Sequence, residues 1–405
     1  MAEAARARAA AIFRTGVPAA DPAAAVERAL ADFPRPPGRL AIVAVGKAAL
    51  RMARAALTRL GPAATLVVTN DENAGPLPGA TVLAAGHPVP DARGLAAGEA
   101  AIAAASGLGA GDALLALISG GGSALLPAPV AGVSLADKAA VNRLLLASGA
   151  PIETMNLVRQ NLSRLKGGGL ARLAAPARVT ALILSDVVGD DLRAIASGPT
   201  VAPLGDAVAA AAVLRDHGIW DACPASVRSH LSAAPPAPPV PAADNRLIGS
   251  NALSVAAMAA AAEGARMPPG ALVGDVAAAA ARVIAEGRPG VTLWGGETTV
   301  RLTGRGLGGR NQELALRVAL AAEAAGWPPG WAFLAGGTDG RAGPTEAAGG
   351  LVDAGTCARI RAAGFDPAAR LADNDSHRAL AAAGDLVITG GTGTNVADLA
   401  VLIRP

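Results

Sequence analysis

The sequence has few aromatic residues, few cysteines and no tyrosine. Phenylalanine and tryptophan together make up only 2% of the 405 residues, so the hydrophobic core has to be built from alanine, leucine, valine and isoleucine. Proteins that bind single-stranded nucleic acids use aromatic rings as stacking platforms, which argues against that function. The two cysteines, Cys223 and Cys357, offer neither a disulfide framework nor metal-ligand spacing, which favours a reducing, cytoplasmic environment.

A strong excess of one charge and a membrane-spanning hydrophobic run are also missing. The net charge is +3, and no Lys/Arg-rich run could follow a nucleic-acid backbone, so no nucleic-acid partner is expected. Residues 1–16 lack the continuous apolar stretch of a secretory signal. The uncharged segment 113–136 contains four glycines and two prolines, which would break a membrane helix, so no membrane association is expected.

Several catalytic signatures are absent. The sequence contains no G-x-x-x-x-G-K-[ST], no G-x-S-x-G and no H-E-x-x-H, and it has only four histidines. These absences exclude a P-loop NTPase and argue against a triad hydrolase or a histidine-ligated zinc enzyme.

The pattern of apolar runs predicts a mostly parallel, doubly wound α/β fold. Short runs that are typical of buried strands alternate with Ala-rich helical stretches, which is the pattern of parallel sheets covered by helices. The expected strands are 40–46, 65–70, 113–120 and 179–188, and the expected helices are 47–60, 93–107, 134–149 and 206–217.

A proline-rich segment, 233–243, divides the chain, since proline at this density continues neither helix nor strand. We therefore expect a first domain over 1–235 and a second α/β domain over 245–405. A hairpin-like pair within 291–304 predicts a mixed sheet in the second domain.

Glycine-rich loops follow several predicted strands, where ligands of open α/β sheets bind. Lys47 opens a helix directly after Gly46. A lysine there opposes the helix dipole, which favours a bound anion, with a solvated lysine as the alternative. The loop after the strand 113–120 can form a nest of N–H groups for a phosphate or carboxylate and consists of Ser119, Gly120, Gly121, Gly122 and Ser123.

A second group of polar residues is expected on one helix face. Asn156, Arg159, Ser163 and Lys166 are spaced three, four and three residues apart, and Gly167–Gly169 would end the helix. Two cations without an acid predict an anion site, and an ordinary solvated face is the alternative.

Three carboxylates, Asp186, Asp190 and Asp191, cluster just after a predicted buried strand. Phosphotransferases use carboxylates at strand ends to hold Mg²⁺ or to accept a hydroxyl proton. An aspartate is also an ordinary helix N-cap, but three within six positions exceed what a cap needs.

The second domain carries candidate loops of its own. Gly304, Gly306 and Gly309 match G-x-G-x-x-G, but the preceding hairpin and the lack of an acidic ribose partner argue against a dinucleotide site. This loop instead delivers Arg310 to a helix start, where a guanidinium can clamp a phosphate or stabilise transferring charge. Further candidates are Glu297 in a turn, Asn311, Asp339, and Thr392 and Asn395 ahead of an expected helix. The loops that carry Asp339, Thr392 and Asn395 could also be capped turns without a ligand.

Taken together, these motifs resemble the bacterial and archaeal glycerate 2-kinases, some of which carry an older label as hydroxypyruvate reductases. The C-terminal part resembles the MOFRL domain of those enzymes. The matching segments occur in order along essentially the whole chain: GKAA (46–49), GHPVPD (86–91), ISGGGSALL (118–126), VRQNLSRLKGGGLA (158–171), LSDVVGDDLRAIASGPT (184–200), GGETTV (295–300), GLGGRNQELAL (306–316), GTDGRAGPTEAAG (337–349) and ITGGTGTNVADL (388–399).

The resemblance implies two α/β domains, the first Rossmann-like and the second smaller and mixed, with the active site in the cleft between them. It implies MgATP as donor and D-glycerate as acceptor, giving 2-phosphoglycerate and ADP. Lys47 and Arg310 fall on the positions implicated in catalysis. Ala342 departs from the family pattern, which usually has an aspartate there, so any role of that aspartate is lost or covered by Glu346.

Our hypothesis assigns a role to each candidate. Asp190 or Asp186 holds the metal or accepts the hydroxyl proton. Substrate is bound by Lys47, Ser119, Glu297 and Arg310. ATP is bound by residues 119–123, Lys166, Asn311, Asp339, Thr392 and Asn395.

Two other functions stay open. One is an NAD(P)H-dependent hydroxypyruvate reductase, and the other is a non-catalytic nucleotide- or anion-binding protein. The sequence carries no signal for the oligomeric state, and a homodimer is compatible with it.

Overall fold

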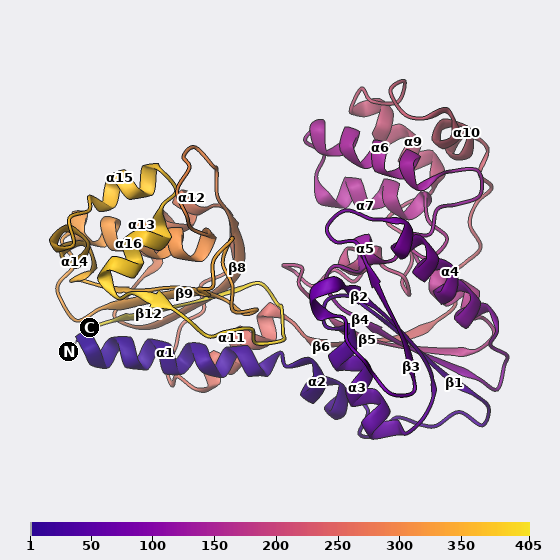
Figure 1. The fold of residues 1–405 in the computed structure, drawn as a ribbon, viewed down its shortest axis with the longest axis horizontal. Coiled ribbons are helices and arrows are strands. Elements are labelled where there is room, and N and C mark those ends of the chain that lie inside the picture. Colours follow the sequence, from indigo (N-terminus) through magenta and orange to yellow (C-terminus); the bar gives the residue numbers. More distant parts are fainter. Residues whose placement is uncertain (1) are drawn as a thin grey trace. The chain divides into compact units, whose positions relative to one another are not determined.

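The computed structural model describes residues 2–405, which form two compact units. The central unit comprises residues 22–248, and the terminal unit combines the residues up to Asp21 with Gly249–Pro405 (Figure 1). The predicted ranges 1–235 and 245–405 differ from this division at the N-terminus, because the first helix packs in the unit that contains the C-terminus. Among residues 2–405, no helix is both long and apolar enough to cross a bilayer.

The central unit is built on a six-stranded sheet in the order β3-β2-β1-β4-β5-β6. Strands β3 to β5 of this order are parallel to their neighbours, and the order is that of the doubly wound dinucleotide-binding fold. The predicted Rossmann-like architecture is therefore confirmed. The strands are β1 (Leu40–Val45), β2 (Ala64–Asn70), β3 (Ala80–Ala85), β4 (Ala113–Ile118), β5 (Arg178–Leu184) and β6 (Ala243–Gly249).

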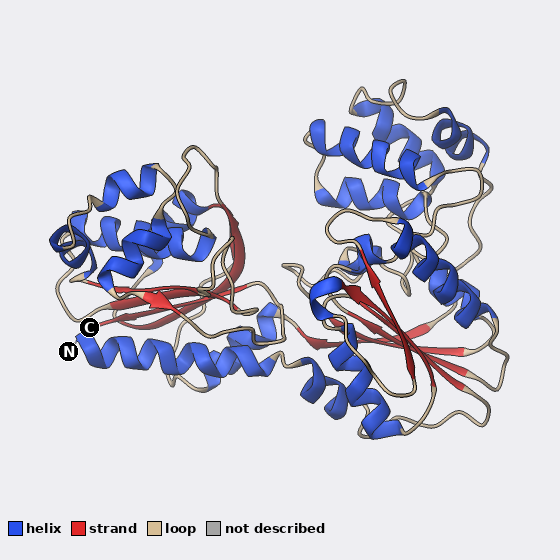
Figure 2. Cartoon of the chain, viewed as in Figure 1, coloured by secondary structure: helices blue, strands red, loops and turns tan. Residues whose placement is uncertain are grey.

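The central strands are buried because helices cover both faces of a parallel sheet. Every residue of β4 is buried, in agreement with its unbroken apolar run ALLALI. The helices are α2 (Pro22–Ala29), α3 (Ala49–Leu60), α4 (Ala92–Ser106), α5 (Gly122–Leu125), α6 (Leu135–Ala147), α7 (Ile152–Asn161), α8 (Gly169–Ala174), α9 (Ala207–Asp216) and α10 (Ala225–Ala233). Helices α6, α7, α9 and α10 share a small hydrophobic core of their own. Figure 2 shows helices of the central unit grouped beyond the end of its sheet.

The terminal unit contains a mixed six-stranded sheet in the order β11-β10-β9-β12-β8-β7. Within residues 2–405, β7 and β8 pair in parallel, and the other neighbouring strands of this sheet pair in antiparallel fashion. The mixed sheet was predicted, but the hairpin within 291–304 was wrong, because one strand runs through 290–299 and a loop follows it. The strands are β7 (Leu272–Asp275), β8 (Gly290–Thr299), β9 (Ala332–Gly337), β10 (Gly349–Asp353), β11 (Leu386–Val387) and β12 (Asp398–Arg404).

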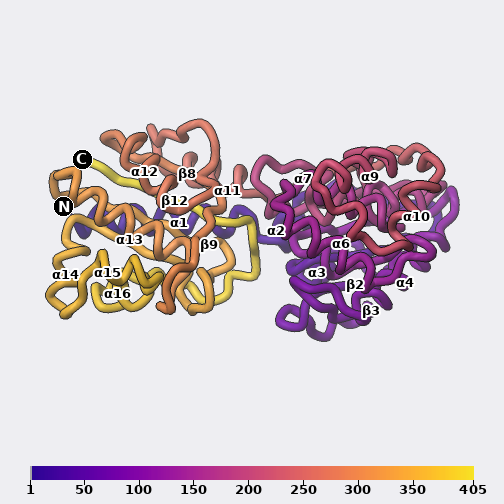
Figure 3. The backbone as a smooth tube through the Cα atoms, turned by 90° about the horizontal axis from the view of Figure 1, so that it is seen from above, coloured from indigo at the N-terminus to yellow at the C-terminus, as the bar shows by residue number. Residues whose placement is uncertain are grey.

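The helices cover both faces of this sheet. Alternate residues of β12 show the two faces: Leu399 and Val401 pack with α1 and α11, whereas Ala400 and Leu402 pack with α12 and α13. Figure 3 shows the start of α1 and the end of β12 at the same edge of the unit. The helices are α1 (Ala2–Ala19), α11 (Asn251–Ala260), α12 (Val276–Glu286), α13 (Arg310–Ala324), α14 (Thr356–Ala362), α15 (Pro367–Ala372) and α16 (Ser376–Ala383).

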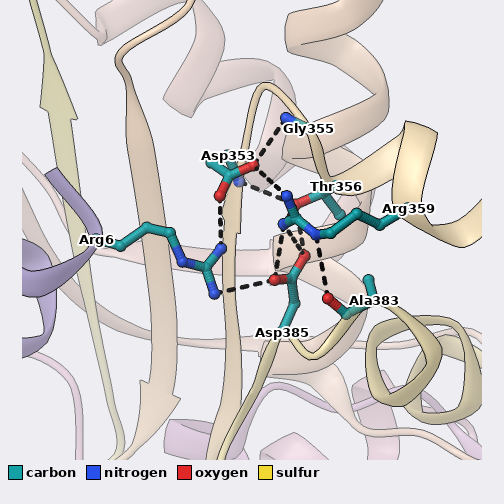
Figure 4. A network of polar contacts seen from close by, with 7 residues as sticks. All are labelled: Arg6, Asp353, Gly355, Thr356, Arg359, Ala383 and Asp385. Carbon is teal, nitrogen blue, oxygen red and sulfur yellow. Dashed lines mark hydrogen bonds and ion pairs between the residues drawn. The ribbon is translucent and has the colours of Figure 1, made fainter. Parts of the chain in front are cut away.

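A network of ion pairs fastens α1 to this sheet (Figure 4). Arg6 reaches Asp353 at 2.8 Å and Asp385 at 2.9 Å. Arg359 binds the same two carboxylates at 3.0 and 2.8 Å. The aspartate side chains are only 5% and 1% exposed, so each buried charge is balanced by two guanidinium groups.

Candidate active site

The loops that follow β1 and β4 meet at the centre of the sheet in the central unit. These strands are neighbours from which the strand order runs outward in both directions, and ligands of open α/β sheets bind at such a switch point. Gly46 follows β1 with a φ of 120°. A Cβ at this position would lie 2.2 Å from Ser119 Oγ, so only glycine allows the two loops to come together.

Hydrogen bonds fix these two loops against each other. Lys47 N donates to Gly120 O at 2.9 Å, and Ala48 N donates to Ser119 Oγ at 3.1 Å. The Ser119 hydroxyl donates in turn to Val45 O at 3.3 Å. Its side chain is therefore satisfied inside the loop junction, while its contact with a ligand stays a prediction.

Lys47, the glycine loop and Asp186 come together at this point. A Cβ on Gly120 would lie 1.9 Å from Asp186 Oδ2, and a Cβ on Gly121 would lie 3.2 Å from the His87 ring and 3.3 Å from Lys47 Cγ. Burial and the nearby Lys47 lower the pKa of His87, so its imidazole is neutral near pH 7. The switch point thus combines a lysine, a carboxylate and closely approached backbone.

A hydrogen-bonded chain continues from Ser123. Its hydroxyl lies 2.7 Å from Ser197 Oγ, which donates to Asn156 Oδ1 at 3.2 Å. Lys166 Nζ donates to Ser123 O at 2.8 Å, and burial lowers the pKa of Lys166 well below its ordinary value. Ser123 and Lys166, which are both predicted site residues, are therefore in direct contact.

The predicted single helix through residues 155–166 is wrong. Helix α7 ends at Asn161, Ser163 forms an isolated bridge with Pro129, and α8 begins at Gly169. Lys166 accordingly reaches Ser123 from a loop. The argument from helical spacing therefore does not apply, and the roles of Arg159 and Lys166 in binding an anion stay a prediction.

The aspartate cluster is divided by the fold. Asp186 lies against Gly120, and Asp191 pairs with Arg193 at 2.8 Å. Asp190 adopts a φ of 54°, and its Oδ1 is buried without a hydrogen-bond partner within residues 2–405. Asp191 is thus engaged by an arginine, whereas Asp186 lies at the glycine loop and Asp190 Oδ1 has no hydrogen-bond partner among the described residues.

A second cluster, in the terminal unit, is centred on Arg310 at the start of α13. Its Nε lies 2.5 Å from Asp398 Oδ2, its Nη2 lies 3.0 Å from Asp398 Oδ1, and its Nη1 lies 2.7 Å from Glu297 Oε1. Asn311 also donates to Asp398, at 2.9 Å. Burial alone would lower the pKa of Arg310, but Asp398 and Glu297 outweigh it and raise the pKa.

Asp398 was missed by the sequence reasoning, although it supplies the main partner of Arg310. It is the first residue of β12, 88 positions away in sequence, so only the pairing of β12 with β8 and β9 brings it to Arg310. The sequence signal that could have identified it is an aspartate directly before the apolar run LAVLI of β12.

The loop before β12 binds the loop after β9. Thr392 Oγ1 donates to Thr338 O at 2.5 Å, and Thr392 N donates to Asp339 O at 3.4 Å. Asn395 Oδ1 accepts a hydrogen bond from Ala397 N at 3.4 Å. The expectation that Thr392 and Asn395 lead into a helix is wrong, because the segment runs into strand β12.

Ala342, which stands where the family usually has an aspartate, is packed in the interior of the terminal unit. This residue is 4% exposed, and its carbonyl oxygen accepts a hydrogen bond from Thr345 Oγ1 at 2.9 Å. Glu346 is 72% exposed and lies 3.7 Å from His377, and its expected role in covering for the family's aspartate stays a prediction.

The G-x-G-x-x-G glycines serve chain packing. A Cβ on Gly304 would lie 2.3 Å from Asp373 O, one on Gly306 would lie 2.4 Å from Asp375 Cβ, and one on Gly309 would lie 2.2 Å from Ala342 C. Backbone of the terminal unit thus fills the space beside these glycines, which supports the rejection of a dinucleotide fingerprint.

Comparison with known proteins gives matches over both units. Residues 8–232 match a family described as a domain of unknown function (DUF4147), and residues 290–398 match the MOFRL family. The chain is 43% identical to a protein of Agrobacterium vitis named "Putative hydroxypyruvate reductase", over 97% of this chain and 93% of that protein. It is 38% identical to the D-glycerate 2-kinase of Thermotoga maritima, over 90% of each. The fold superimposes on the crystal structure of a Thermotoga maritima glycerate kinase with a TM-score of 0.90, at 37% identity and 100% coverage of both chains.

Proposed function

This chain belongs to the glycerate 2-kinase family, and from that membership we propose that it transfers the terminal phosphoryl group of ATP to D-glycerate, releasing 2-phosphoglycerate and ADP. The observation that carries the proposal is the meeting of Lys47, the glycine loop 120–122 and Asp186 at the switch point of the central sheet. Phosphoryl transfer needs little covalent chemistry from the protein. It depends on positioning and on neutralising the charge of the transferring group, which these residue types supply.

In this mechanism the C2 hydroxyl oxygen of glycerate attacks the terminal phosphorus, and the bond from that phosphorus to the bridging oxygen of ADP breaks. Asp190 or Asp186 accepts the hydroxyl proton. Lys47 and Arg310 neutralise the glycerate carboxylate and the transferring phosphoryl group, and Asp398 positions the Arg310 guanidinium through two hydrogen bonds.

Mg²⁺ is the expected cofactor of such a reaction. Residues 2–405 contain no group of three or more histidine, cysteine or acidic side chains arranged to hold a metal. Mg²⁺ is commonly held by one or two carboxylates together with substrate phosphates. Asp190, whose Oδ1 is buried without a hydrogen-bond partner in residues 2–405, and Asp186, which lies beside the glycine loop, fit that requirement. When bound, the ion would neutralise charge on the phosphate oxygens.

Reduction of hydroxypyruvate is a second candidate function, because the relative from Agrobacterium vitis carries that name. The packing of Gly304, Gly306 and Gly309 against neighbouring backbone argues against it. Oxidation of NADH by the protein with hydroxypyruvate, followed by absorbance, separates the two functions.

The reaction is tested by incubating the protein with MgATP and D-glycerate and recording the phosphorus NMR spectrum. We expect a new monoester signal of 2-phosphoglycerate together with ADP. A 3-phosphoglycerate signal would keep the kinase and overturn the position of transfer, and absence of any phosphoglycerate would overturn the proposal.

The role of Arg310 is tested by Arg310→Ala, with Arg305→Ala as the matched control. Arg305 is an exposed arginine of the same loop. An arginine that stabilises the transferring phosphoryl group contributes roughly 10³-fold or more to turnover, so we expect that loss for Arg310→Ala and little change for the control. Equal turnover of the two variants would contradict the assignment.

A further inference from the structure

A pocket of about 460 Å³ lies within the central unit. Its walls are the loop 87–90, α5 with the residues on either side of it (121–127), one side of α6, and side chains from α7 and from the loop that precedes α8. Figure 1 shows α6 and α7 in the helical group beyond α5, on the side of the sheet where the loops after β1 and β4 lie. Its volume falls in the range of about 300–1,000 Å³ that is typical of small-molecule sites.

The lining of this pocket is positively charged without a compensating acid. Lys138 and Arg143 come from α6, Arg159 comes from α7, and Lys166 follows from the loop before α8. None of the lining side chains is an aspartate or a glutamate. Such a concentration of one charge in a concave, partly apolar site focuses the electrostatic potential and attracts anions.

The three innermost cations have only neutral partners or none. Lys138 Nζ is buried and has no hydrogen-bond partner within residues 2–405. Arg159 Nε donates to the amide oxygen of Asn142 at 2.8 Å, and Lys166 Nζ donates to the carbonyl oxygen of Ser123 at 2.8 Å. Buried charges are normally paired with opposite charge, so a multivalent anion would supply the partner that these three groups lack among the described residues.

The pKa values of Lys138, Arg159 and Lys166 reflect the same lack of an opposite charge in the pocket. Burial, with a contribution from Arg159, lowers the pKa of Lys138 to about 7. Burial also lowers the pKa of Lys166 and Arg159, and Lys138 and Arg159 repel the charge on Lys166. Strongly shifted groups that converge in one pocket are typical of functional sites.

All three lysines of the chain lie in or beside this pocket. The chain has three lysines and 32 arginines. Lys138 and Lys166 line the pocket, and Lys47 lies at its edge, with its Cγ 3.3 Å from the position of a Cβ on Gly121. The ammonium group of lysine is a compact point charge with three donors, which suits contact with phosphate oxygens.

The outer part of the pocket is apolar. Val89 and Leu146 line it and are 71% and 60% exposed, and Pro88, Pro90 and Leu135 lie beside them. Exposed apolar side chains around a cationic floor suit a ligand with a flat, weakly polar end and a strongly anionic end. Glycerate, with three carbon atoms and one carboxylate, has neither the size nor the charge.

We propose that this pocket holds the donor nucleotide, with its phosphate chain against Lys138, Arg159 and Lys166 and its base covered by Val89 and Leu146. The inference rests on the proposed function and extends it, because it assigns the donor to one pocket and adds Lys138, Arg159 and the apolar rim to the binding residues. The terminal phosphate then lies next to Gly121, on the side where Lys47 and Asp186 meet the glycine loop.

The test measures binding of ADP and of inorganic tripolyphosphate to the full chain by titration calorimetry. Lys138→Met keeps most of the apolar stem and removes an unpartnered buried charge, so the variant should fold with an unchanged or higher melting temperature. A hydrogen bond to a charged group corresponds to about 10- to 100-fold in affinity, so we expect both probes to bind that much more weakly. Arg54→Met, which removes an exposed cation from α3, should bind both probes like the wild type.

A second variant separates the two ends of the ligand. Leu146→Ser should weaken ADP by about 3- to 10-fold, because the base loses apolar cover, and should leave tripolyphosphate unchanged. Equal effects on both probes would overturn the placement of the base.

The remaining outcomes distinguish this inference from the reaction itself. Wild-type affinity of Lys138→Met for both probes, with phosphorylation of glycerate intact, would overturn the inference and leave the kinase. Displacement of tripolyphosphate by 2-phosphoglycerate but not by ADP would assign the pocket to the acceptor and also overturn it. Loss of ADP binding in Lys138→Met without any turnover of glycerate in the wild type would support the pocket and refute the proposed reaction.

Discussion

Removing the Arg6 side chain should loosen the terminal unit without unfolding it. Arg6 donates to Asp353 and Asp385, which are 5% and 1% exposed (Figure 4). Loss of the sole partner of a buried carboxylate costs about 3–5 kcal/mol. Arg359 still pairs with both carboxylates in Arg6→Ala, so neither charge is left alone. We therefore expect a smaller loss of about 1–3 kcal/mol, since hydrogen bonds to charged groups are worth about that much.

Tryptophan fluorescence during urea unfolding measures this loss in the correct unit. Trp294, Trp327 and Trp331 belong to the terminal unit, and Trp294 and Trp331 are each 2% exposed. A Trp220→Phe background removes the one tryptophan of the central unit, so the signal reports on the terminal unit alone. Arg8→Ala is the matched control, because Arg8 is an exposed arginine on the same helix.

The loss of stability in Arg6→Ala should also depend on pH. Burial would raise the pKa of Asp353, but its hydrogen bonds with Arg359, Gly355 and Arg6 outweigh this and lower the pKa. A carboxyl group with a depressed pKa stabilises the fold fully above its unfolded pKa of about 3.9, and this contribution is lost as the pH falls through the folded pKa. The difference between wild type and Arg6→Ala should therefore be constant near pH 7 and shrink below about pH 4. An unfolding midpoint of Arg6→Ala equal to that of Arg8→Ala at pH 7 would refute the reasoning.

Two further predictions follow from the packing of single residues. Gly120→Ala would place a Cβ 1.9 Å from Asp186 Oδ2, so we expect displacement of Asp186, a stability loss of about 1–3 kcal/mol and a fall in kcat, measured by ADP release. Gly75→Ala, whose Cβ would have its nearest neighbour at 3.6 Å, is the control, and wild-type kcat in Gly120→Ala would show that Asp186 need not hold its place. Burial raises the pKa of Cys357 to about 11 and also raises that of Cys223, so both thiols should react with a disulfide reagent at pH 8 only after unfolding. Rapid labelling of two thiols in the native protein would contradict this expectation.

The local parts of the fold follow closely from sequence patterns. The apolar run 40–46 and the helical stretch 93–107 correspond to β1 and α4 within two residues, because a buried strand or a helix is encoded by neighbouring side chains. The strand at 80–85 was missed, since its residues are only partly buried and its sequence ATVLAA also suits a helix. The failure of the helix through 155–166 has a similar cause, because spacing alone does not show where a helix ends.

The candidate site could also be predicted only where it depends on local sequence. The glycine loop and Lys47 stand out in the sequence because glycine is needed where two loops approach closely, as the contact between Gly46 and Ser119 shows. Asp398 and Lys138 were not predicted as site residues. Asp398 is defined by its pairing with Arg310, and Lys138 by its position beside Arg159 and Lys166, and these neighbours come from other elements of the chain.

The sequence by itself determined the fold class, most of the central strands and helices, and the loops that follow these strands, because these properties depend on residues close together in the chain. The tertiary structure decided which side chains act together. It joined Arg310 to Asp398, set Lys138 beside Arg159 and Lys166, and tied α1 to the terminal unit through Arg6. These pairings depend on how strands align and helices pack, and that packing is fixed by burial across the whole unit.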